Sequence, residues 1–249
     1  MNRYFIYLAY NGRNYCGWQI QPNGITVQQR IQQCLSILLR KSVTIIGAGR
    51  TDAGVHANLM TAHFDWEEIL STTSLTKRLN GILPCDILIY KIIPVKKNAH
   101  ARFDAISRKY KYYITYQKNP FRNEQLFRLK QPLNKHLMNE ASNILSEYSD
   151  FTSFCKLHSN TRTNVCRISK AEWNTVQGID IFTIKADRFL RNMVRSIVGT
   201  MIDIGKNKLS ITDFRKIIES KNHIMLKSSV PAHALFLTDI EYPNWIFKN

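Results

Sequence analysis

Apolar and polar positions in the first hundred residues predict four strands and two helices. Four stretches are rich in aromatic and β-branched residues, and in the third of them apolar and polar residues alternate. Two other stretches place apolar residues three or four apart, which is the spacing of one helical face. Thr26 begins a capping sequence before the first helix, and Pro84 ends the second. The expected strands cover residues 3–10, 42–48, 59–66 and 86–95.

The second half of the chain repeats this order. Gln177 and Gly178 separate two strand-like stretches and predict a hairpin. A long apolar pattern predicts a helix that ends at Gly205, which is expected to be a left-handed cap. The expected strands cover residues 107–116, 167–176, 179–186 and 234–242, and the expected helices lie near 137–148, 188–204 and 211–219.

The repeated order predicts an α+β fold of two similar βαββαβ units, of the RRM or ferredoxin-like kind. Their sheets should be mainly antiparallel, with helices covering one face. The expected domains are residues 1–100, an N-terminal unit, and 101–249, a C-terminal unit, with residues 96–106 as the joint. An active-site cleft is expected between the two units.

The balance of charged residues indicates what kind of partner the protein binds. The 249 residues include 35 Lys and Arg against 18 Asp and Glu, which gives a net charge of +17. The basic residues recur among aromatic and apolar ones over residues 102–195, so a folded nucleic-acid-binding surface is favoured over a basic tail. Two less regular basic stretches, 118–133 and 220–233, are candidate RNA-contacting loops.

Several classes of protein are disfavoured by the same sequence. No stretch has the roughly 18 consecutive apolar residues of a membrane helix, and the first twelve residues resemble a strand rather than a targeting peptide. The five cysteines are scattered without a CxxC pair, which disfavours a disulfide framework or a structural zinc site. A reduced, cytoplasmic setting is expected.

Asp52 lies two residues after Arg50 in GAGRTDAGVHA, residues 47–57. The glycines permit a tight turn and close approach of a ligand, while Arg50 can keep the carboxylate ionised or bind a phosphate. A structural Asp that caps a turn is the other interpretation. The sequence has no GxxxxGK[ST] or GxGxxG pattern and no cluster of carboxylates for a metal. These residues suit covalent or proton-transfer chemistry at a sugar–base bond without a cofactor.

Aromatic residues offer stacking surfaces for a base. Tyr110 shares a strand face with Arg108 and can stack on an extruded base, although core packing is the alternative and is preferred for Tyr112 and Tyr116. Trp18 can likewise stack on a base or be buried beside the first strand.

Three arginines follow the spacing of one helical face. Arg188, Arg191 and Arg195 are three and four residues apart in the expected long helix, opposite its apolar stripe. Phosphate binding and a solvated basic face are both consistent with this spacing.

Taken together, the motifs resemble the TruA family of tRNA pseudouridine synthases. The resemblance runs in order from the first strand to the last, and GRTDAGVHA is its most specific part. It is carried by AYNGRNYCGWQIQ (9–21), GAGRTDAGVHA (47–57), LNGILP (79–84), ARFDAISRKYKYYI (101–114), DFTSF (150–154), FLRNMVRSIVG (189–199) and VPAHALFL (230–237).

The resemblance implies an enzyme that isomerises uridine to pseudouridine at positions 38, 39 and 40 of the tRNA anticodon stem-loop. It implies no cofactor and a homodimer that binds one tRNA across both subunits. Asp52 matches the catalytic aspartate, Tyr110 the active-site tyrosine, Arg195 the basic residue that pairs with the aspartate, and Arg50 the arginine that displaces or replaces the target base. RNA contacts are expected from Arg108, Lys109, Lys111, Arg188, Arg191 and Trp18.

Two alternatives come from other functional classes. A non-catalytic RNA-binding protein of tandem RRM-like units explains the charge and the order of elements. It does not explain Asp52, because a carboxylate facing phosphates weakens binding, and an RNP1-like aromatic string is missing. A metal-dependent nuclease is disfavoured because the chain has no carboxylate cluster.

Overall fold

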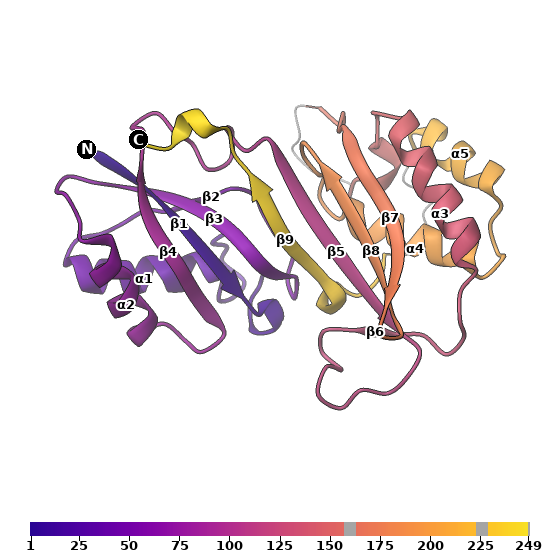
Figure 1. Cartoon of the computed structure of the whole chain (residues 1–249), viewed down its shortest axis with the longest axis horizontal. Coiled ribbons are helices and arrows are strands. Elements are labelled where there is room, and N and C mark those ends of the chain that lie inside the picture. The colour runs from indigo at the N-terminus through magenta and orange to yellow at the C-terminus, as the bar shows by residue number, and fades with distance from the viewer. Residues whose placement is uncertain (157–162, 223–228, 249) are drawn as a thin grey trace. The chain divides into compact units, whose positions relative to one another are not determined.

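The computed structural model describes residues 1–156, 163–222 and 229–248 (Figure 1). The chain forms two compact units: the first contains residues 1–107 and 236–249, and the second contains residues 108–235. The last strand was expected to close the second half, but residues 236–249 cluster with the first unit. The reason is that this strand pairs with a strand of the first unit, as described next.

The first unit is built on a sheet with the strand order β4-β1-β3-β9. Strand β1 (Asn2–Tyr10) pairs antiparallel with β3 (His56–Trp66) and with β4 (Ile87–Val95). The short β2 (Ile46–Gly47) pairs antiparallel with β3, and β9 (Leu235–Glu241) pairs parallel with it. Helix α2 (Thr72–Ile82) packs on β4, and α1 (Val27–Leu39) packs beside α2 (Figure 1).

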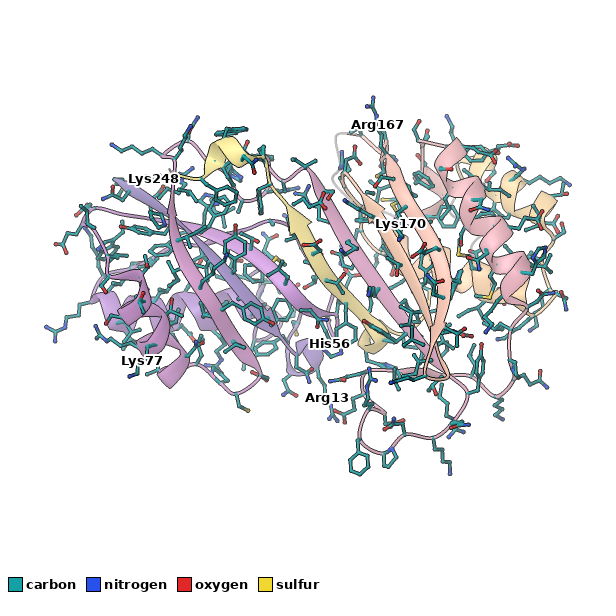
Figure 2. The ribbon with its side chains drawn as sticks, viewed as in Figure 1. Arg13, His56, Lys77, Arg167, Lys170 and Lys248 are labelled. Atoms are coloured by element: carbon teal, nitrogen blue, oxygen red, sulfur yellow. The ribbon has the colours of Figure 1, made fainter. Side chains whose placement is uncertain are left out.

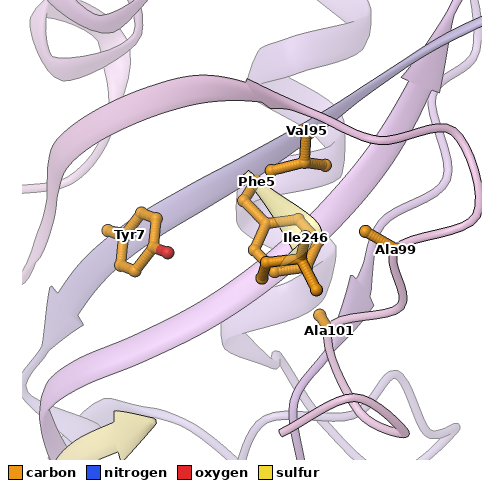
Figure 3. Packing of buried hydrophobic residues seen from close by; sticks show 6 residues of the cluster. All are labelled: Phe5, Tyr7, Val95, Ala99, Ala101 and Ile246. Carbon is orange, nitrogen blue, oxygen red and sulfur yellow. The ribbon is translucent and has the colours of Figure 1, made fainter. Parts of the chain in front are cut away.

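Both faces of this sheet are covered. On the face away from the helices, Phe5 and Tyr7 of β1 pack with Val95, and a cluster of buried residues completes the contact (Figure 3). The other members are Ala99, Ala101 and Ile246. Residues 96–106, expected to be only a joint, therefore form part of the core of the first unit.

The second unit has a three-stranded antiparallel core with the order β5-β8-β7. These strands are β5 (Ser107–Thr115), β7 (Ile168–Val176) and β8 (Ile179–Ala186), and β6 (Phe127–Arg128) adds a short parallel pairing to β5. The predicted hairpin is confirmed, with Gln177 at φ 50° and Gly178 at φ 75° in its two-residue turn.

Three helices accompany this sheet (Figures 1 and 2). Helix α3 (Lys135–Ile144) packs on β7, while α4 (Met193–Gly205) and α5 (Ile211–Ser220) both pack against α3. Helix α4 begins five residues later than the predicted start at 188. Asn192, at its N-terminal boundary, adopts a left-handed φ of 65°, and a helix cannot run through such a residue.

The prediction that Gly205 is a left-handed helix cap is wrong. Gly205 is the last residue of α4, and no positive φ is found there. A Cβ at this position would lie 2.6 Å from Sδ of Met138 and 3.0 Å from Cβ of Leu133. The glycine therefore allows α4 to pack closely on the start of α3, instead of supplying a turn conformation.

The α+β class and the mainly antiparallel sheets are confirmed. The helix expected near 211–219 is present as α5, whereas the short β6 was not predicted. Among the described residues, no helix is long and apolar enough to cross a membrane.

Candidate functional site

The loop that carries Asp52 connects β2 to β3 and is fixed by contacts with the N-terminal segment. The hydroxyl of Thr51 hydrogen-bonds to the phenol of Tyr10 at 2.8 Å, and this contact is buried. The Thr51 carbonyl accepts a hydrogen bond from the Trp18 amide at 3.2 Å, and the Asp52 carbonyl accepts one from the Val55 amide at 3.1 Å. The backbone on both sides of Asp52 is therefore held in place.

Two glycines of the N-terminal segment make this close approach possible. Gly17 has a φ of 85°, and a Cβ on it would lie 2.3 Å from the Thr51 carbonyl oxygen. A Cβ on Gly12 would lie 1.9 Å from the Val55 carbonyl oxygen. No side chain fits at either position, so the NGRNYCGW segment and the Asp52 loop are packed backbone against backbone.

His56, the first residue of β3, follows the Asp52 loop directly and has a structural role. Its side chain is buried, its Nδ1 accepts a hydrogen bond from the Gly12 amide at 3.0 Å, and its ring stacks on Phe236 at 4.5 Å. The ring therefore ties the N-terminal segment to the start of β3.

Asp52 itself is half-buried, between the buried Thr51 and Val55, and Arg50 is exposed. A partly exposed carboxylate on a rigid loop can meet a ligand without a rearrangement of the backbone. This exposure agrees with the functional interpretation of Asp52.

Trp18 is only 2% exposed, which is the burial alternative raised by the sequence. Its ring lies beside Tyr10, with the ring centroids 6.1 Å apart, and a Cβ on Gly47 would lie 2.4 Å from Nε1. A side chain packed in this way supports the Asp52 loop, and its burial favours the structural interpretation of Trp18 over stacking on a base at the protein surface.

Tyr110 lies on β5 in the second unit and is half-buried. Its ring meets that of Phe189 edge-on, at 5.2 Å and an interplanar angle of 90°. The next tyrosine on the same face, Tyr112, is fully buried and donates to the Pro231 carbonyl at 3.0 Å. The preference for core packing is therefore confirmed for Tyr112. Tyr116 is half-buried and donates to the buried Asp180.

Arg195 is half-buried in the first turn of α4. Its Nε donates to the Val230 carbonyl at 2.7 Å, and the Val230 amide donates back to the Arg195 carbonyl at 3.3 Å. Burial raises the pKa of the nearby Tyr112, and the positive charge of Arg195 opposes that rise. Arg195 is thus held against the segment that precedes β9.

The basic residues of the second unit that were predicted to contact RNA do not all lie on one face of its sheet. Successive residues of β5 point to opposite faces of the sheet, so Lys109 and Lys111 lie on the face opposite Tyr110. Arg108 donates to the Asp187 carbonyl at 2.8 Å. Arg188 and Arg191 precede α4, so they do not continue the helical face of Arg195 as the spacing predicted.

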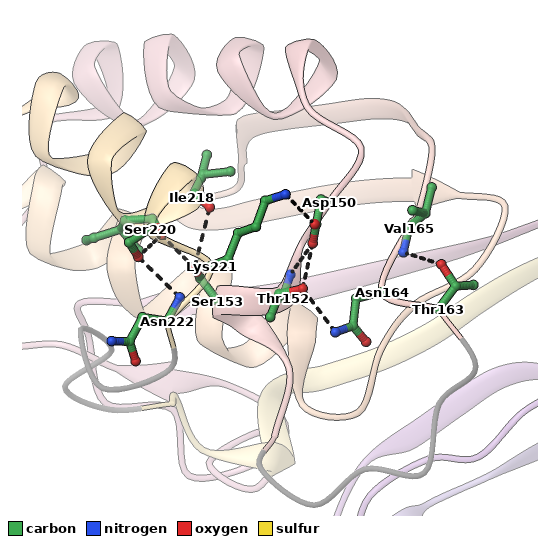
Figure 4. Close-up of polar contacts among 11 residues, drawn as sticks. Asp150, Thr152, Ser153, Thr163, Asn164, Val165, Ile218, Ser220, Lys221 and Asn222 are labelled. Carbon is green, nitrogen blue, oxygen red and sulfur yellow. Dashed lines mark hydrogen bonds and ion pairs between the residues drawn. The ribbon is translucent and has the colours of Figure 1, made fainter.

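The DFTSF stretch, residues 150–154, forms a network of polar contacts at the end of α5 (Figure 4). Asp150 accepts hydrogen bonds from the amide and the hydroxyl of Thr152, at 3.0 and 2.6 Å, and pairs with Lys221 at 3.0 Å. Ser153 donates to the Ile217 carbonyl at 2.6 Å. These contacts give the stretch a structural role.

The structure describes the whole of the first basic stretch and part of the second. In the stretch 118–133, Leu126, Leu129 and Leu133 are buried, whereas Phe121 is 95% exposed. In the stretch 220–233, residues 223–228 lie outside the described part of the chain.

Asp52, Arg50 and Trp18 belong to the first unit, and the remaining predicted site residues belong to the second. Arg102, which sequence reasoning assigned to no role, lines a cavity of the first unit together with Arg50. Its place within ARFDA, next to an aromatic residue, was the available signal. In the described residues no group of His, Cys, Asp and Glu is arranged to hold a metal ion.

Comparison with known proteins identifies the family to which the chain belongs. A model of the family described as "tRNA pseudouridine synthase" matches residues 148–243. The tRNA pseudouridine synthase A of Parabacteroides distasonis is 57% identical over 99% of this chain and 98% of its own length. That of Bacteroides thetaiotaomicron is 54% identical over 100% and 93%, and the tRNA pseudouridine synthase A 1 of Protochlamydia amoebophila is 36% identical over 98% of each. The chain therefore belongs to the tRNA pseudouridine synthase family and is an isomerase.

Proposed function

We propose that this enzyme converts uridine to pseudouridine at positions 38, 39 and 40 of the tRNA anticodon stem-loop, with Asp52 as the catalytic carboxylate. The observation that carries the proposal is the setting of Asp52, a half-buried acid on a loop whose backbone is fixed on both sides. The charge of +17 suits an RNA substrate, because basic residues neutralise phosphates.

The chemistry replaces one bond to the ribose by another. The target uridine leaves the stack, at a cost of a few kcal/mol. Asp52 either attacks C1′ or removes the C2′ proton, and the bond between C1′ and N1 of uracil breaks. The uracil rotates within the site and C5 bonds to C1′, while the bond from Asp52 to C1′ breaks or, in the other route, C2′ regains its proton. C5 then loses its proton to solvent and N1 takes one up. Substrate and product have the same atoms, so no oxidant, reductant or cofactor is consumed.

Arg195 and Tyr110 are the other residues proposed to support these steps. The guanidinium of Arg195 favours the ionised form of the carboxylate in a site that the RNA shields from water. Tyr110 packs against the uracil, with its ring already oriented by Phe189. Arg50, exposed on the Asp52 loop, takes the space vacated by the base.

The enzyme is further proposed to act in the cytoplasm as a homodimer, with one tRNA bound across both subunits and no cofactor. Light scattering tests the dimer directly, because it would have twice the 29.0 kDa mass of the chain.

The position of the product tests the proposed specificity. Bulk tRNA from a strain lacking the protein is incubated with the purified enzyme, treated with carbodiimide and read by primer extension. We expect new stops only at positions 38, 39 and 40. Stops elsewhere would overturn the specificity, and binding of tRNA without any new stop would favour a non-catalytic RNA-binding protein.

A further inference from the structure

A cavity of about 200 Å³ opens in the first unit beside the Asp52 loop. Trp18 and Gln28 line its inner part, Gly47 and Gly49 one wall, and Arg50 and Arg102 are exposed side chains at its edge. We call it the Gly49 pocket. It is smaller than the roughly 300–1,000 Å³ of typical small-molecule sites, so it suits one planar group such as a nucleobase.

Both polar atoms of the Gln28 side chain, which lines the Gly49 pocket, are hydrogen-bonded within the protein. Gln28 Nε2 donates to the Ile45 carbonyl at 2.8 Å, and Gln28 Oε1 accepts from the Ile20 amide at 3.0 Å. The amide side chain therefore connects α1 to the segments on both sides of the cavity. Such a pocket exists before the ligand arrives and costs little reorganisation on binding.

The charges of the Gly49 pocket are all positive. Among its lining residues, all of which are described, two are arginines and none is acidic. A guanidinium is planar, binds phosphate with two parallel hydrogen bonds and stacks on rings. The combination of an uncharged cavity and two arginines at its edge fits a base together with its phosphate.

Arg102 is held in position by its own segment. The amides of Arg102 and Phe103 both donate to Nδ1 of His100, at 3.1 and 3.2 Å. The Ala101 amide donates to Nδ1 of the buried His63 at 3.2 Å, and the Arg102 guanidinium lies over the Phe103 ring, 5.6 Å from its centroid. These contacts tie Arg102 to β3 and limit its movement.

The two glycines of the wall differ in what they contact. A Cβ on Gly47 would collide with the Trp18 ring, so packing explains that glycine. A Cβ on Gly49 would meet no atom within 4 Å, and its φ lies outside the left-handed region. Glycine lowers the stability of the folded state, because it gives the unfolded chain more conformational freedom. A glycine that packing does not require at the wall of a cavity therefore indicates space kept for a ligand.

The Gly49 pocket lies on the same loop as the catalytic carboxylate. Arg50 is two residues from Asp52 and Gly49 is three. Because consecutive Cα atoms are about 3.8 Å apart, their Cα atoms lie within about 7.6 Å and about 11.4 Å of that of Asp52. A nucleotide next to the target uridine therefore reaches this cavity while the target lies at Asp52.

We infer that the Gly49 pocket binds the base of the nucleotide adjacent to the target uridine, with the phosphate of that nucleotide on Arg102. This inference rests on the proposed function, because it needs the target at Asp52. It makes the Gly49 pocket a determinant of which uridine is presented for reaction.

A double-mutant cycle on RNA affinity tests the inference. The probes are anticodon stem-loop RNAs with a single uridine among positions 38–40, either intact or abasic at the 5′ or the 3′ neighbour of that uridine. The enzymes are the wild type, Gly49→Leu, which fills the Gly49 pocket, and Arg102→Gln, which removes one positive charge. Filter binding gives the dissociation constant of each pair.

Removal of one stacked base is worth about 1–3 kcal/mol, so we expect one of the abasic RNAs to bind the wild type about tenfold more weakly. Gly49→Leu should weaken binding of the intact RNA similarly, yet change binding of that abasic RNA by less than about twofold. The inference is wrong if, for both abasic RNAs, the loss of affinity caused by Gly49→Leu is as large as it is for the intact RNA, so that the two single losses multiply. Should Gly49→Leu fail to fold, the smaller Gly49→Val decides the question in the same way. Arg102→Gln tests the phosphate contact and should weaken binding of the intact and the abasic RNAs alike, because the abasic RNAs keep that phosphate.

Matched controls separate the Gly49 pocket from general effects. Gly81→Leu places the same side chain in open space on α2, and Arg78→Gln removes one charge from the same helix. Both should bind every RNA as the wild type does. The affinity cycle needs no turnover, so failure of the proposed function, seen as wild-type enzyme that releases no tritium from 5-tritiated uridine, remains a separate outcome.

Discussion

At the residue scale, the GRTD stretch predicted Asp52 and Arg50 as site residues, because both lie within three positions of Gly49 in one short segment. The partners that hold that stretch could not be predicted in the same way. Tyr10 and Gly17 contact Thr51 across more than thirty residues, and such contacts follow from how the segments meet. Trp18 shows the same limit, because its motif is compatible with both a stacking and a buried ring, and only packing decides.

His63 provides a prediction at this scale. Burial, together with the positive charge of Arg3 and the neighbouring His100, lowers its pKa to about 4, although Asp65 and Asp104 oppose the shift. The unfolded chain, with a pKa of 6.5, therefore binds more protons than the native state between pH 6.5 and 4. Stability should fall by about 3 kcal/mol as the pH drops through this window.

Chemical denaturation at a series of pH values measures this loss. His63→Asn keeps an oxygen that can accept from the Ala101 amide but does not titrate, so its loss over pH 6.5–4 should be smaller by about 3 kcal/mol. Equal pH dependence in both proteins would show that His63 is not the group responsible.

At the scale of elements, periodicity predicted the order of strands and helices. The observed elements depart from the predicted ones where local backbone conformation or tertiary contacts set the boundary. Nothing in the apolar pattern of residues 188–204 marks the left-handed Asn192 that delays α4. Similarly, a glycine at a helix end suggested a cap, whereas Gly205 is required by the contact between α4 and the start of α3. The parallel pairing of β9 with β3 depends on tertiary contacts that chain order does not reveal.

Two helical glycines should respond oppositely to the same substitution. In Gly205→Ala the new Cβ overlaps Met138 and Leu133, so we expect a loss of about 1–3 kcal/mol in the free energy of unfolding. In Gly81→Ala the Cβ meets no atom within 4 Å, and helix propensity should increase stability by up to about 1 kcal/mol. Urea denaturation of both variants measures the difference. A stabilised Gly205→Ala would contradict the packing explanation.

At the scale of the whole molecule, composition indicated a polyanionic partner, and family membership identified the class of reaction. The net charge of +17 leads to a prediction about tRNA affinity. If six or more phosphates are neutralised, the affinity should fall by about 10³-fold or more between 50 and 200 mM salt. Filter binding across this range measures the slope.

The same titration tests Lys109. Lys109→Gln should reduce the slope of log affinity against log salt by about one if its ammonium contacts a phosphate. Lys77→Gln, on the exposed side of α2 (Figure 2), is the matched control and should leave the slope unchanged. A slope unchanged in Lys109→Gln would remove this residue from the RNA-binding surface.

The role of Asp52 is tested most directly by release of tritium from tRNA labelled at C5 of uridine, with tRNA affinity measured on the same samples. Asp52→Asn keeps the shape of the side chain and removes its charge, and Glu68→Gln is the control for loss of one exposed carboxylate in the same unit. We predict that Asp52→Asn binds tRNA within about threefold of wild type and loses activity by on the order of 10⁴-fold or more. Release at the rate of the wild type, or a loss of binding that matches the loss of activity, would contradict the catalytic role of Asp52.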